Sequence, residues 1–408
     1  MNILIVHMRY FPDKTGTAPL VTQLAQDLVV HGSKVSIITS LPHYGRDTVH
    51  PEYLDFKGLF RHSEEFGVNI IRTRVYVPQG TGFMQRVWNY VTYNFLSVIA
   101  GIKADRADVI LAVNPPITTT FAAWIVSLFH RAPLIVGIQD VWPDCIIQVN
   151  KLKSRILIVF SKMLEKIQYR IAKKVIVLSM GMQSNLEKKG VDPGKIEIIA
   201  NWADTDSVKP LPRENDFSHN HELEDRFVVL FAGNHGYIAA LDKIILAAEI
   251  LREIPEILFF FGEGSVKGEL MRYADEKGLK NVRFLTTQSE QQWLEMLAAA
   301  DLALVSLRAD LADLNVPSKV YTLMSAARPI LASVPKDSEV ASLVLSANSG
   351  IICTPEDPNA LANSILEMKN SPGLLDVYGK NGRKYLLETS NRNLQTKKYL
   401  SALKGSLD

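Results

Sequence analysis

Residues 301–333 read DLALVSLRADLADLNVPSKVYTLMSAARPILAS, and this stretch decides the fold. The apolar run 302–307 has the length of a buried strand, and the Asp-rich segment 308–316 shows no helical or strand period. Pro317 marks the start of a helix, because proline is tolerated in the first helical turn. The apolar positions of that helix recur at helical spacing, at Val320, Leu323 and Met324. With a further apolar run at 330–333, the stretch predicts a strand, loop, helix and strand, the repeating unit of a doubly wound α/β domain.

The start of this helix collects groups that bind anions. Pro317 and Ser318 precede Lys319, so free backbone amides, the positive end of the helix dipole and one ammonium group converge there. The arrangement suits an anion such as a diphosphate. An ordinary capped helix would show the same residues, and the segment taken alone favours that simpler interpretation.

The same unit recurs in two separate regions of the chain. The apolar run 2–6 and the helical pattern over 17–31 open the first region. A stretch rich in Pro, Asn, His and acidic residues, 209–225, has the composition of a linker. We therefore expect an N-terminal domain over 1–208 and a C-terminal domain over 226–388, each built on a doubly wound parallel sheet.

Composition excludes several classes of protein. With 408 residues, 47% hydrophobic and 22% charged, the chain can bury two cores, and a net charge of +2 gives no global field for nucleic acid. Cys145 and Cys353 lie far apart and lack metal-ligand spacing, as expected in a reducing cytoplasm. The longest apolar run, 117–129, is shorter than the ~20 residues of a membrane-spanning helix, so we expect a soluble or peripheral protein.

A polar cluster follows the apolar run 133–139. The hexapeptide QDVWPD at 139–144 would lie past the carboxyl end of a strand, where open α/β sheets bind ligands. Asp140 is a candidate to bind a hydroxyl or to stabilise developing charge, and the alternative is that it only caps the following turn.

Two helical segments leave a choice between core packing and membrane contact. Segment 84–102 is rich in aromatic residues, and segment 151–174 holds eight basic residues against the single acidic Glu165. The second segment also carries an apolar stripe: Ile156, Phe160, Met163, Leu164, Ile167 and Ile171. A basic amphipathic helix can lie on an anionic membrane, or it can pack on a sheet with a solvated basic face, and the pattern leaves both open.

Motifs along the whole chain resemble those of the family-4 retaining glycosyltransferases. They are YFPDKTGTAP at 10–19, LPHY at 41–44, QDVWPD at 139–144, NWAD at 201–204, GNHG at 233–236, GEG at 262–264 and PSKVYTLMSAARP at 317–329. Two glycine turns after two apolar runs, at the family's spacing from the PSK segment, are stronger evidence than either turn alone. The branch that they resemble builds capsule, colanic acid and O-antigen, often by moving fucose or an N-acetylated amino-deoxyhexose such as N-acetylfucosamine.

The resemblance implies an architecture and an activity. It implies the α/β GT-B fold, with two Rossmann-like domains facing a deep cleft and a C-terminal helix within 389–408 that crosses back to the N-terminal domain. It implies a hexosyltransferase that moves a deoxy- or amino-sugar from a nucleotide-diphosphate sugar to a surface-polysaccharide acceptor. In this branch the acceptor is commonly linked to polyprenyl diphosphate, which would place the protein in the cytoplasm, at the inner face of the cytoplasmic membrane.

The resemblance also assigns residues, with the donor in the second domain and the acceptor in the first. The donor-binding candidates are Gly233, Asn234, His235, Gly236, Gly262, Gly264, Pro317, Ser318, Lys319 and Thr322. The acceptor-binding candidates are Gly16, Thr17, His43 and Trp142, and for His43 an ordinary surface position is an equal alternative. The catalytic candidates are Asp140 in the acceptor-side wall and Lys319 on the leaving diphosphate.

The chain departs from the family pattern at three points. The family commonly places an Arg and a Lys just after the GNHG-like turn, whereas here no cation occurs before Lys243. Thr322 and Leu314 stand where the family has its pair of Glu residues, and Ala327 replaces the usual Gly before Arg328-Pro329. Lys319, His235 and helix amides must then hold the diphosphate, and Thr322 or a backbone group must hold the ribose.

Two alternatives to the transferase remain. One is another GT-B chemistry, such as a nucleotide-sugar 2-epimerase that needs no acceptor. The other is a catalytically inactive GT-B subunit that acts as a scaffold, which the departures favour and the intact GNHG, QDVWPD and PSK segments oppose. For the transferase we expect no cofactor and no essential metal.

Overall fold

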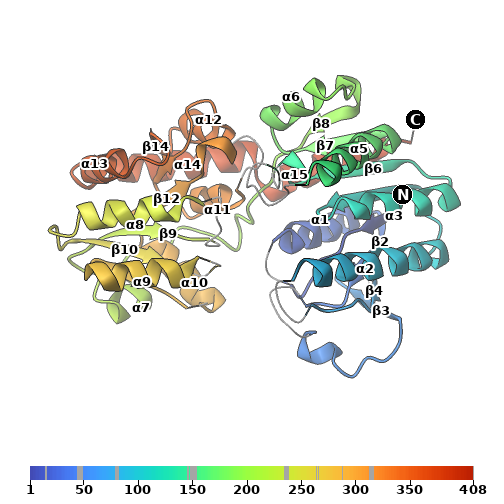
Figure 1. Ribbon diagram of the computed structural model, residues 1–408, viewed down its shortest axis with the longest axis horizontal. Coiled ribbons are helices and arrows are strands. Elements are labelled where there is room, and N and C mark those ends of the chain that lie inside the picture. The colour runs from blue at the N-terminus through green and yellow to red at the C-terminus, as the bar shows by residue number, and fades with distance from the viewer. Residues whose placement is uncertain are drawn as a thin grey trace. The chain divides into compact units, whose positions relative to one another are not determined.

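The computed structural model describes residues 1–13, 16–43, 49–78, 82–144, 147, 154–233, 239–262, 264, 266–286, 288–311 and 317–407. The chain divides into two units (Figure 1). The first unit consists of Met1–Ala200 and Asn393–Asp408, and the second consists of Asn201–Arg392.

The first unit is built on a sheet that has eight strands within the described residues, in the order β3-β4-β2-β1-β5-β6-β7-β8. Neighbouring strands run parallel except β3 and β4, which are antiparallel. The strands are β1 (Asn2–Val6), β2 (Lys34–Ser40), β3 (Phe60–Glu65), β4 (Val68–Thr73), β5 (Val109–Asn114), β6 (Leu134–Ile138), β7 (Lys174–Val177) and β8 (Ile196–Ile198). The central strands are unbroken apolar runs, as expected for parallel strands that helices cover on both faces.

The edge strand β3 is a correction to the all-parallel sheet expected from the sequence. Its residues read FRHSEE, and its side chains are exposed or half-buried along its length. An edge strand with one solvated face needs no apolar run, so the hydrophobic pattern does not mark it.

The helices of the first unit cover the two faces of this sheet. They are α1 (Ala18–Val30), α2 (Phe83–Lys103), α3 (Thr118–His130), α5 (Arg155–Ile171), α6 (Met180–Lys188) and α15 (Arg392–Lys404), with short 3-10 turns at Pro51–Tyr53 and Pro193–Lys195. The C-terminal helix α15 packs beside α1, where Thr396 Oγ1 donates a hydrogen bond to Asp27 Oδ2 at 3.0 Å. The helix α2 packs against α3, and α3 against α5 (Figure 1).

The second unit is built on a parallel sheet with six strands among the described residues, in the order β11-β10-β9-β12-β13-β14. The strands are β9 (Phe227–Phe231), β10 (Ile257–Phe261), β11 (Val282–Phe284), β12 (Leu302–Ser306), β13 (Ile330–Ser333) and β14 (Gly350–Cys353). The core on one face of this sheet joins Phe259 and Phe261 to Ile245 of one helix and Ile365 of another.

The helices of the second unit alternate with these strands, as in a doubly wound domain. They are α7 (Asp216–Asn220), α8 (Leu241–Ile250), α9 (Lys267–Lys277), α10 (Glu290–Ala299), α11 (Lys319–Ser325), α12 (Glu339–Ser346), α13 (Pro358–Lys369) and α14 (Pro372–Thr389), with a 3-10 turn at Ala309–Leu311. The described parts of the stretch 301–333 form the strand, helix and strand that its pattern predicts, and residues 312–316 of the predicted loop lie outside the described residues.

The segment 209–225, expected as a linker, belongs to the second unit. Its helix α7 begins with a capping box at Asn215. The Nε of Arg213 donates a hydrogen bond to Asp301 Oδ1 at 2.7 Å. Arg213 also donates to the carbonyl groups of Leu223 and Arg226, which fixes the segment against the start of β9. The composition resembles that of a linker, but the ion pair of Arg213 and the buried side chains of Phe217 and Leu223 hold the segment in the second unit.

Candidate active site

The sheet of the second unit reverses its direction of winding between β9 and β12. The strands β10 and β11 lie on one side of this point, and β13 and β14 lie on the other. Because β9 and β12 are parallel, the loops that follow them leave the sheet at the same carboxyl edge. Open α/β sheets bind ligands at such a point. The residues after Phe231 and after Ser306 are therefore the ones to test for a ligand site.

Gly233 and Lys319 meet at this edge, although they are far apart in sequence. A Cβ atom on Gly233 would lie 3.4 Å from Cδ and 3.8 Å from Nζ of Lys319. Gly233 also has a φ of +147°, which side chains of L-residues rarely adopt. Glycine is thus favoured here both by its backbone conformation and by the close approach of the lysine.

The ammonium group of Lys319 is held in an apolar setting. Its Nζ lies 3.6 Å from the centroid of the Phe231 ring, at the end of β9. Burial lowers the pKa of Lys319 to about 7, and within the described part of the chain no carboxylate opposes that shift. A cation in this position costs free energy until an anion pairs with it, because its own solvation is largely lost.

The other donor-binding candidates in the described residues lie after β10 or at the start of and within α11. Gly262 and Gly264 follow β10, and Gly264 has a φ of +155°. Pro317 and Ser318 form the turn that begins α11, where the carbonyl of Pro317 accepts the N–H of Val320 at 3.1 Å. Thr322 is half-buried within α11, a helix of seven residues. Asn234, His235 and Gly236 of the GNHG motif, and Leu314 in place of a family Glu, lie outside the described residues.

Arg308 is a cation near this edge that is not among the expected site residues. It lies two residues past the end of β12, and it donates to Asp242 Oδ1 and to Glu356 Oε1, each at 2.9 Å. Because Asp242 lies in the first turn of α8, Arg308 ties the end of β12 to the start of that helix. A charged residue two positions past a buried strand is the only signal in the sequence that points to it. Its two carboxylate partners make it an anchor of the site rather than an open anion receptor.

The first unit has the corresponding point between β1 and β5. His7, the residue after β1, is buried, and its Nδ1 donates to the carbonyl of Val113 at 2.9 Å. Its Nε2 is then an acceptor and receives the hydroxyl of Thr17 at 2.8 Å. Burial lowers the pKa of His7 to about 4, so the ring is neutral at pH 7 and keeps this pattern.

His7 explains how Thr17 is positioned. Thr17 occupies the N-cap position of α1 but makes no capping hydrogen bond, since its hydroxyl is used by His7. Gly16, beside it, is exposed and has a φ of +64°. His7 is a structural support for Thr17 that the motif does not show, and a polar residue directly after the first strand is the signal for it.

The hexapeptide 139–144 follows β6, next to β5 in the same sheet. Gln139 is buried, while Asp140 and Trp142 are half-buried at the carboxyl edge of the strand. The last residue, Asp144, accepts an ion pair from Lys189 Nζ at 2.7 Å, and the same ammonium contacts Glu165 Oε1 at 2.5 Å. The last residue of the motif therefore anchors the loop to α5 and α6.

His43 has protein partners at both ring nitrogens. Its Nδ1 donates to the carbonyl of Leu41 at 2.7 Å, and its Nε2 accepts from Asn89 Nδ2 at 3.1 Å. Burial lowers its pKa. The ring thus has no free nitrogen for an acceptor sugar, which supports the structural interpretation of this residue.

Comparison with known proteins identifies the family. A glycosyl transferase 4-like domain matches residues 15–202, and a glycosyl transferases group 1 domain matches residues 212–385. The probable glycosyltransferase WbjE of Pseudomonas aeruginosa is 30% identical over 270 residues, which cover 65% of this chain and 67% of that protein. The chain belongs to the glycosyltransferases.

Further relatives of this glycosyltransferase extend over its whole length. The putative colanic acid biosynthesis glycosyl transferase WcaI of Escherichia coli is 22% identical over 99% of this chain and 100% of that protein. Anabaena Alr3699/HepE, solved in complex with UDP and glucose, superposes with a TM-score of 0.73 at 16% identity, covering 98% and 99% of the two chains. Sucrose-phosphate synthase of Thermosynechococcus elongatus gives a TM-score of 0.75 at 16% identity and 99% coverage of both chains. The fold is GT-B, as the sequence motifs predict.

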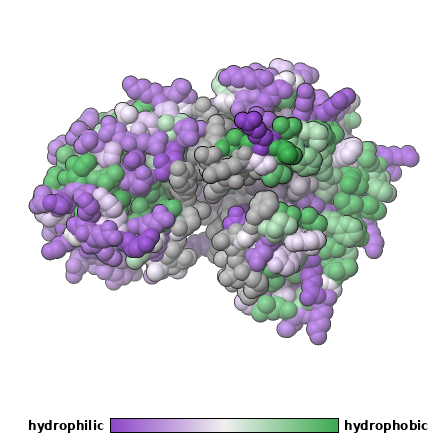
Figure 2. Space-filling model, in the orientation of Figure 1, coloured by the Kyte–Doolittle hydropathy of each residue, from purple (hydrophilic) through white to green (hydrophobic). Residues whose placement is uncertain are grey.

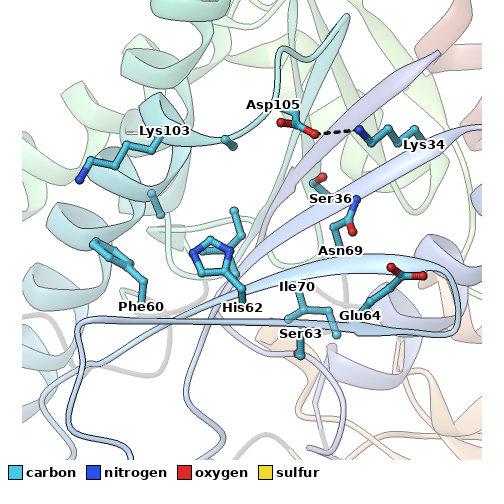
Figure 3. Close-up of a pocket in the computed structure, with 13 residues that line it drawn as sticks. Lys34, Ser36, Phe60, His62, Ser63, Glu64, Asn69, Ile70, Lys103 and Asp105 are labelled. Atoms are coloured by element: carbon cyan, nitrogen blue, oxygen red, sulfur yellow. Dashed lines mark hydrogen bonds and ion pairs between the residues drawn. The ribbon is translucent and has the colours of Figure 1, made fainter.

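A groove of about 650 Å³ in the first unit of the glycosyltransferase holds none of the expected site residues (Figure 3). It lies at the amino ends of β2 and β4, where Lys34 Nζ pairs with Asp105 Oδ2 at 2.7 Å. His62 and Asn69 also line it. The expected acceptor residues lie at the opposite, carboxyl edge of the same sheet, so this groove is separate from them.

The sequence of the glycosyltransferase contains one Asp-x-Asp, at Asp204 and Asp206, a pattern that metal-dependent transferases use. Asp204 Oδ1 accepts the backbone N–H groups of Asp206 and Ser207, each at 3.1 Å, and Oδ2 pairs with Arg392 at 3.3 Å. Asp204 thus closes a turn. Among the residues that the structure describes, no cluster of His, Cys, Asp and Glu has the arrangement of a metal site, and no helix has the length and apolarity to cross a membrane.

Proposed function

We propose that this glycosyltransferase moves a deoxy- or amino-hexose from a nucleoside-diphosphate sugar to a surface-polysaccharide acceptor, with retention of configuration. The buried ammonium group of Lys319 beside Gly233 carries this proposal, since it is a cation without a carboxylate partner in the described residues, at the switch point of the sheet. In this proposal the second unit binds the donor and the first binds the acceptor.

On the donor side, Lys319 pairs with the diphosphate. The positive φ values of Gly233 and Gly264 let the loops after β9 and β10 approach the phosphates with backbone groups. When the sugar leaves, negative charge grows on the diphosphate, and a cation already fixed in an apolar setting stabilises it without reorganising. Arg308 and its carboxylate partners hold the surrounding loop.

On the acceptor side, Thr17 and Asp140 lie at the carboxyl edge of the first sheet, after β1 and β6, which β5 separates. His7 holds Thr17 through its Nε2, and the pair formed by Asp144 and Lys189 fixes the loop that carries Asp140. Gly16 and Trp142 complete the acceptor contacts in this proposal. His43 is left out of it, because its ring nitrogens are both used within the protein.

Retention needs no nucleophile from the protein. The bond between the anomeric carbon and the donor phosphate oxygen breaks, and the bond to the acceptor oxygen forms on the same face of the sugar. The acceptor proton passes to the departing phosphate oxygen, so the leaving group itself serves as the base. Lys319 stabilises the charge that remains on the diphosphate.

The relatives support the choice of substrates. WcaI carries colanic acid biosynthesis in its description, and HepE is solved with UDP and glucose. We place the reaction at the inner face of the cytoplasmic membrane, on a lipid-linked acceptor, as the resemblance of the motifs implies.

A thermal-shift screen of the whole protein against UDP, GDP, dTDP, CDP and ADP tests the donor site. We expect one nucleotide to raise the unfolding midpoint, because a ligand that binds only the folded state stabilises it. No shift with any of the five, in folded protein, would favour the scaffold. Turnover of the matching nucleotide sugar without an acceptor would favour an epimerase or hydrolase.

The variant Lys319→Met tests the residue that carries the proposal. We expect the nucleotide-dependent shift to disappear, with a loss of donor affinity of about 1–3 kcal/mol, the scale of a hydrogen bond to a charged group. The ligand-free variant should fold at least as stably as the parent, because it no longer buries a charge. Lys280→Met, which removes an exposed lysine of the same unit, is the control and should keep the shift. If the nucleotide raised the unfolding midpoint of Lys319→Met as much as that of the parent, Lys319 would not be part of the donor site.

A further inference from the structure

The helix α5 buries mainly polar side chains and exposes apolar side chains beside its basic ones. The residues buried against the rest of the unit are Ser161, Glu165, Gln168 and Tyr169. Half of the apolar stripe expected from the sequence is exposed instead, since Ile156 is 81%, Phe160 50% and Met163 49% exposed. The rest of the stripe, Leu164, Ile167 and Ile171, is half-buried. The buried polar groups are satisfied, since Glu165 accepts from Tyr169 and from Lys189. The outward apolar face is therefore a stable feature of the fold and not a helix that lacks its core.

The neighbouring helix α3 also exposes an apolar face. It contains no Asp, Glu, Lys or Arg between Thr118 and His130. Its outward positions recur at helical spacing, and Phe129 and Leu128 are 64% and 60% exposed. One face of α3 is buried, with Ala123 and Val126 0% exposed, and its other face is also apolar although it is exposed.

The long helix α2 carries a third outward stripe. Its exposed side chains follow one line along the helix: Met84, Trp88, Val91, Phe95 and Ile102. Its opposite face packs on the sheet, where Tyr93 is fully buried and donates to the carbonyl of Ile38. Aromatic residues in this helix thus divide between the core and the surface.

These three stripes form one surface, which we name the apolar helix face. It consists of the exposed apolar side chains of α2, α3 and α5: Met84, Trp88, Val91, Phe95, Ile102, Ile125, Leu128, Phe129, Ile156, Leu157, Val159, Phe160 and Met163. The helices lie side by side, since α2 packs on α3 and α3 on α5 (Figure 1). Figure 2 shows hydrophobic atoms over α2 and α3 in the first unit. A patch drawn from three helices is larger than the isolated apolar residues that ordinary surfaces carry.

The charged residues of these helices have one sign. The exposed ones among the described residues are Arg86, Lys103, Arg155, Lys162, Lys166 and Arg170. The acidic residue in the same helices, Glu165, is buried and paired with Lys189. An apolar surface bordered by lysine and arginine complements a bilayer with anionic headgroups. A second copy of the chain, placed on this face by two-fold symmetry, would bring these cations against one another.

We propose that the apolar helix face docks the protein on an anionic membrane surface, with the aromatic and aliphatic side chains of α2, α3 and α5 in the headgroup region. The geometry of the first unit alone supports this docking surface. Its purpose, to hold the enzyme beside a lipid-linked acceptor, rests on the proposed function.

Vesicle sedimentation of the whole protein tests the docking. We expect the protein to sediment with vesicles of phosphatidylcholine and phosphatidylglycerol, and far less with phosphatidylcholine alone or at high salt. The double variant Phe129→Ser/Phe160→Ser removes exposed apolar area, and Lys162→Gln/Lys166→Gln removes two cations. Each should weaken binding about tenfold or more. Leu345→Ser, at an exposed position of the second unit, is the control and should bind as the parent does.

Several results would overturn the proposal. They are absence of binding to both kinds of vesicle, equal binding by the parent and the Phe129→Ser/Phe160→Ser variant, and a dimer in solution that this variant separates. Equal binding to neutral and anionic vesicles would overturn its electrostatic part. The nucleotide-dependent thermal shift should be the same in all these variants, so a failure of docking and a failure of the proposed transfer are told apart.

Discussion

A buried lysine that has no carboxylate partner among the described residues is the feature that most closely links residue chemistry to function in this protein. Lys319 lies against the Phe231 ring, and burial lowers its pKa to about 7. Its pKa in the unfolded chain is about 10.4. The folded state therefore binds fewer protons than the unfolded state between these values, and stability contributed by Lys319 rises as pH increases from about 7. Below about pH 7 Lys319 is charged in both states, and its burial then lowers the free energy of unfolding by the full amount.

The same shift predicts a pH dependence for donor binding. A diphosphate favours the charged form of Lys319, so binding above about pH 7 requires the uptake of a proton. We expect the affinity for the matching nucleotide sugar to be constant below about pH 7 and to fall as pH rises above it. Titration calorimetry in buffers of different ionisation enthalpy measures the proton uptake directly. Affinity that is independent of pH between 6 and about 9 would contradict the assignment, and Lys319→Met should show no uptake.

Lys189 has a structural role, because its ammonium group pairs with two carboxylates. It neutralises Asp144 of the QDVWPD motif and the buried Glu165 of α5. Lys189→Met would leave two carboxylates without their cation, and we expect a loss of about 2–3 kcal/mol in the free energy of unfolding. Burial raises the pKa of Glu165, so protonation should reduce the loss at acid pH. Urea denaturation near neutral and acid pH measures this, with the exposed neighbour Lys188→Met as the control.

At the scale of elements, the end of α11 shows why one family position is usually glycine. Ala327 follows the C-cap and has a φ of +53°. Its N–H donates to the carbonyl of Met324, and the N–H of Arg328 donates to that of Leu323. This is the Schellman arrangement, which favours glycine at the residue with positive φ. The carbonyl of Ala327 also lies so close to Gly379 of α14 that a Cβ there would be 2.2 Å away.

Ala327→Gly should therefore stabilise the protein. Relief of the left-handed conformation is worth about 1–2 kcal/mol, and the extra chain entropy of glycine offsets about 0.5–1 kcal/mol of it. We expect a net gain of up to about 1 kcal/mol in chemical denaturation. The reverse control is Gly278→Ala at the end of α9, where φ is +63° and no atom lies within 4 Å of the added Cβ. Gly278→Ala should lower the free energy of unfolding by a similar amount. If Ala327→Gly and Gly278→Ala both lowered it, the explanation would be wrong.

At the scale of the whole molecule, the two units each place their loops at the carboxyl edge of their own sheet, and neither needs a metal in the proposed reaction. Cations from side chains and backbone amides take the role of stabilising the diphosphate. We expect transfer to survive EDTA, measured as product formed with the nucleotide sugar that the thermal-shift screen selects. Full loss of activity that Mg²⁺ or Mn²⁺ restores would show that this part of the proposal is wrong. The control is the same assay with EDTA that has been saturated with Ca²⁺.

The sequence by itself determined the two-domain α/β fold, because apolar runs at strand length and helical spacing recur in stretches such as 301–333. It also marked most of the candidate site, since glycines and a lysine after strands carry a local signal. It did not determine contacts between distant residues, such as Gly233 with Lys319 or His7 with Thr17, because no spacing in the chain encodes them. Nor did it determine which way the apolar stripe of α5 faces. Only the tertiary structure decided that, because Asn114 and Lys189 satisfy the buried Gln168 and Glu165 of α5, while Ile156, Phe160 and Met163 of its stripe stay exposed.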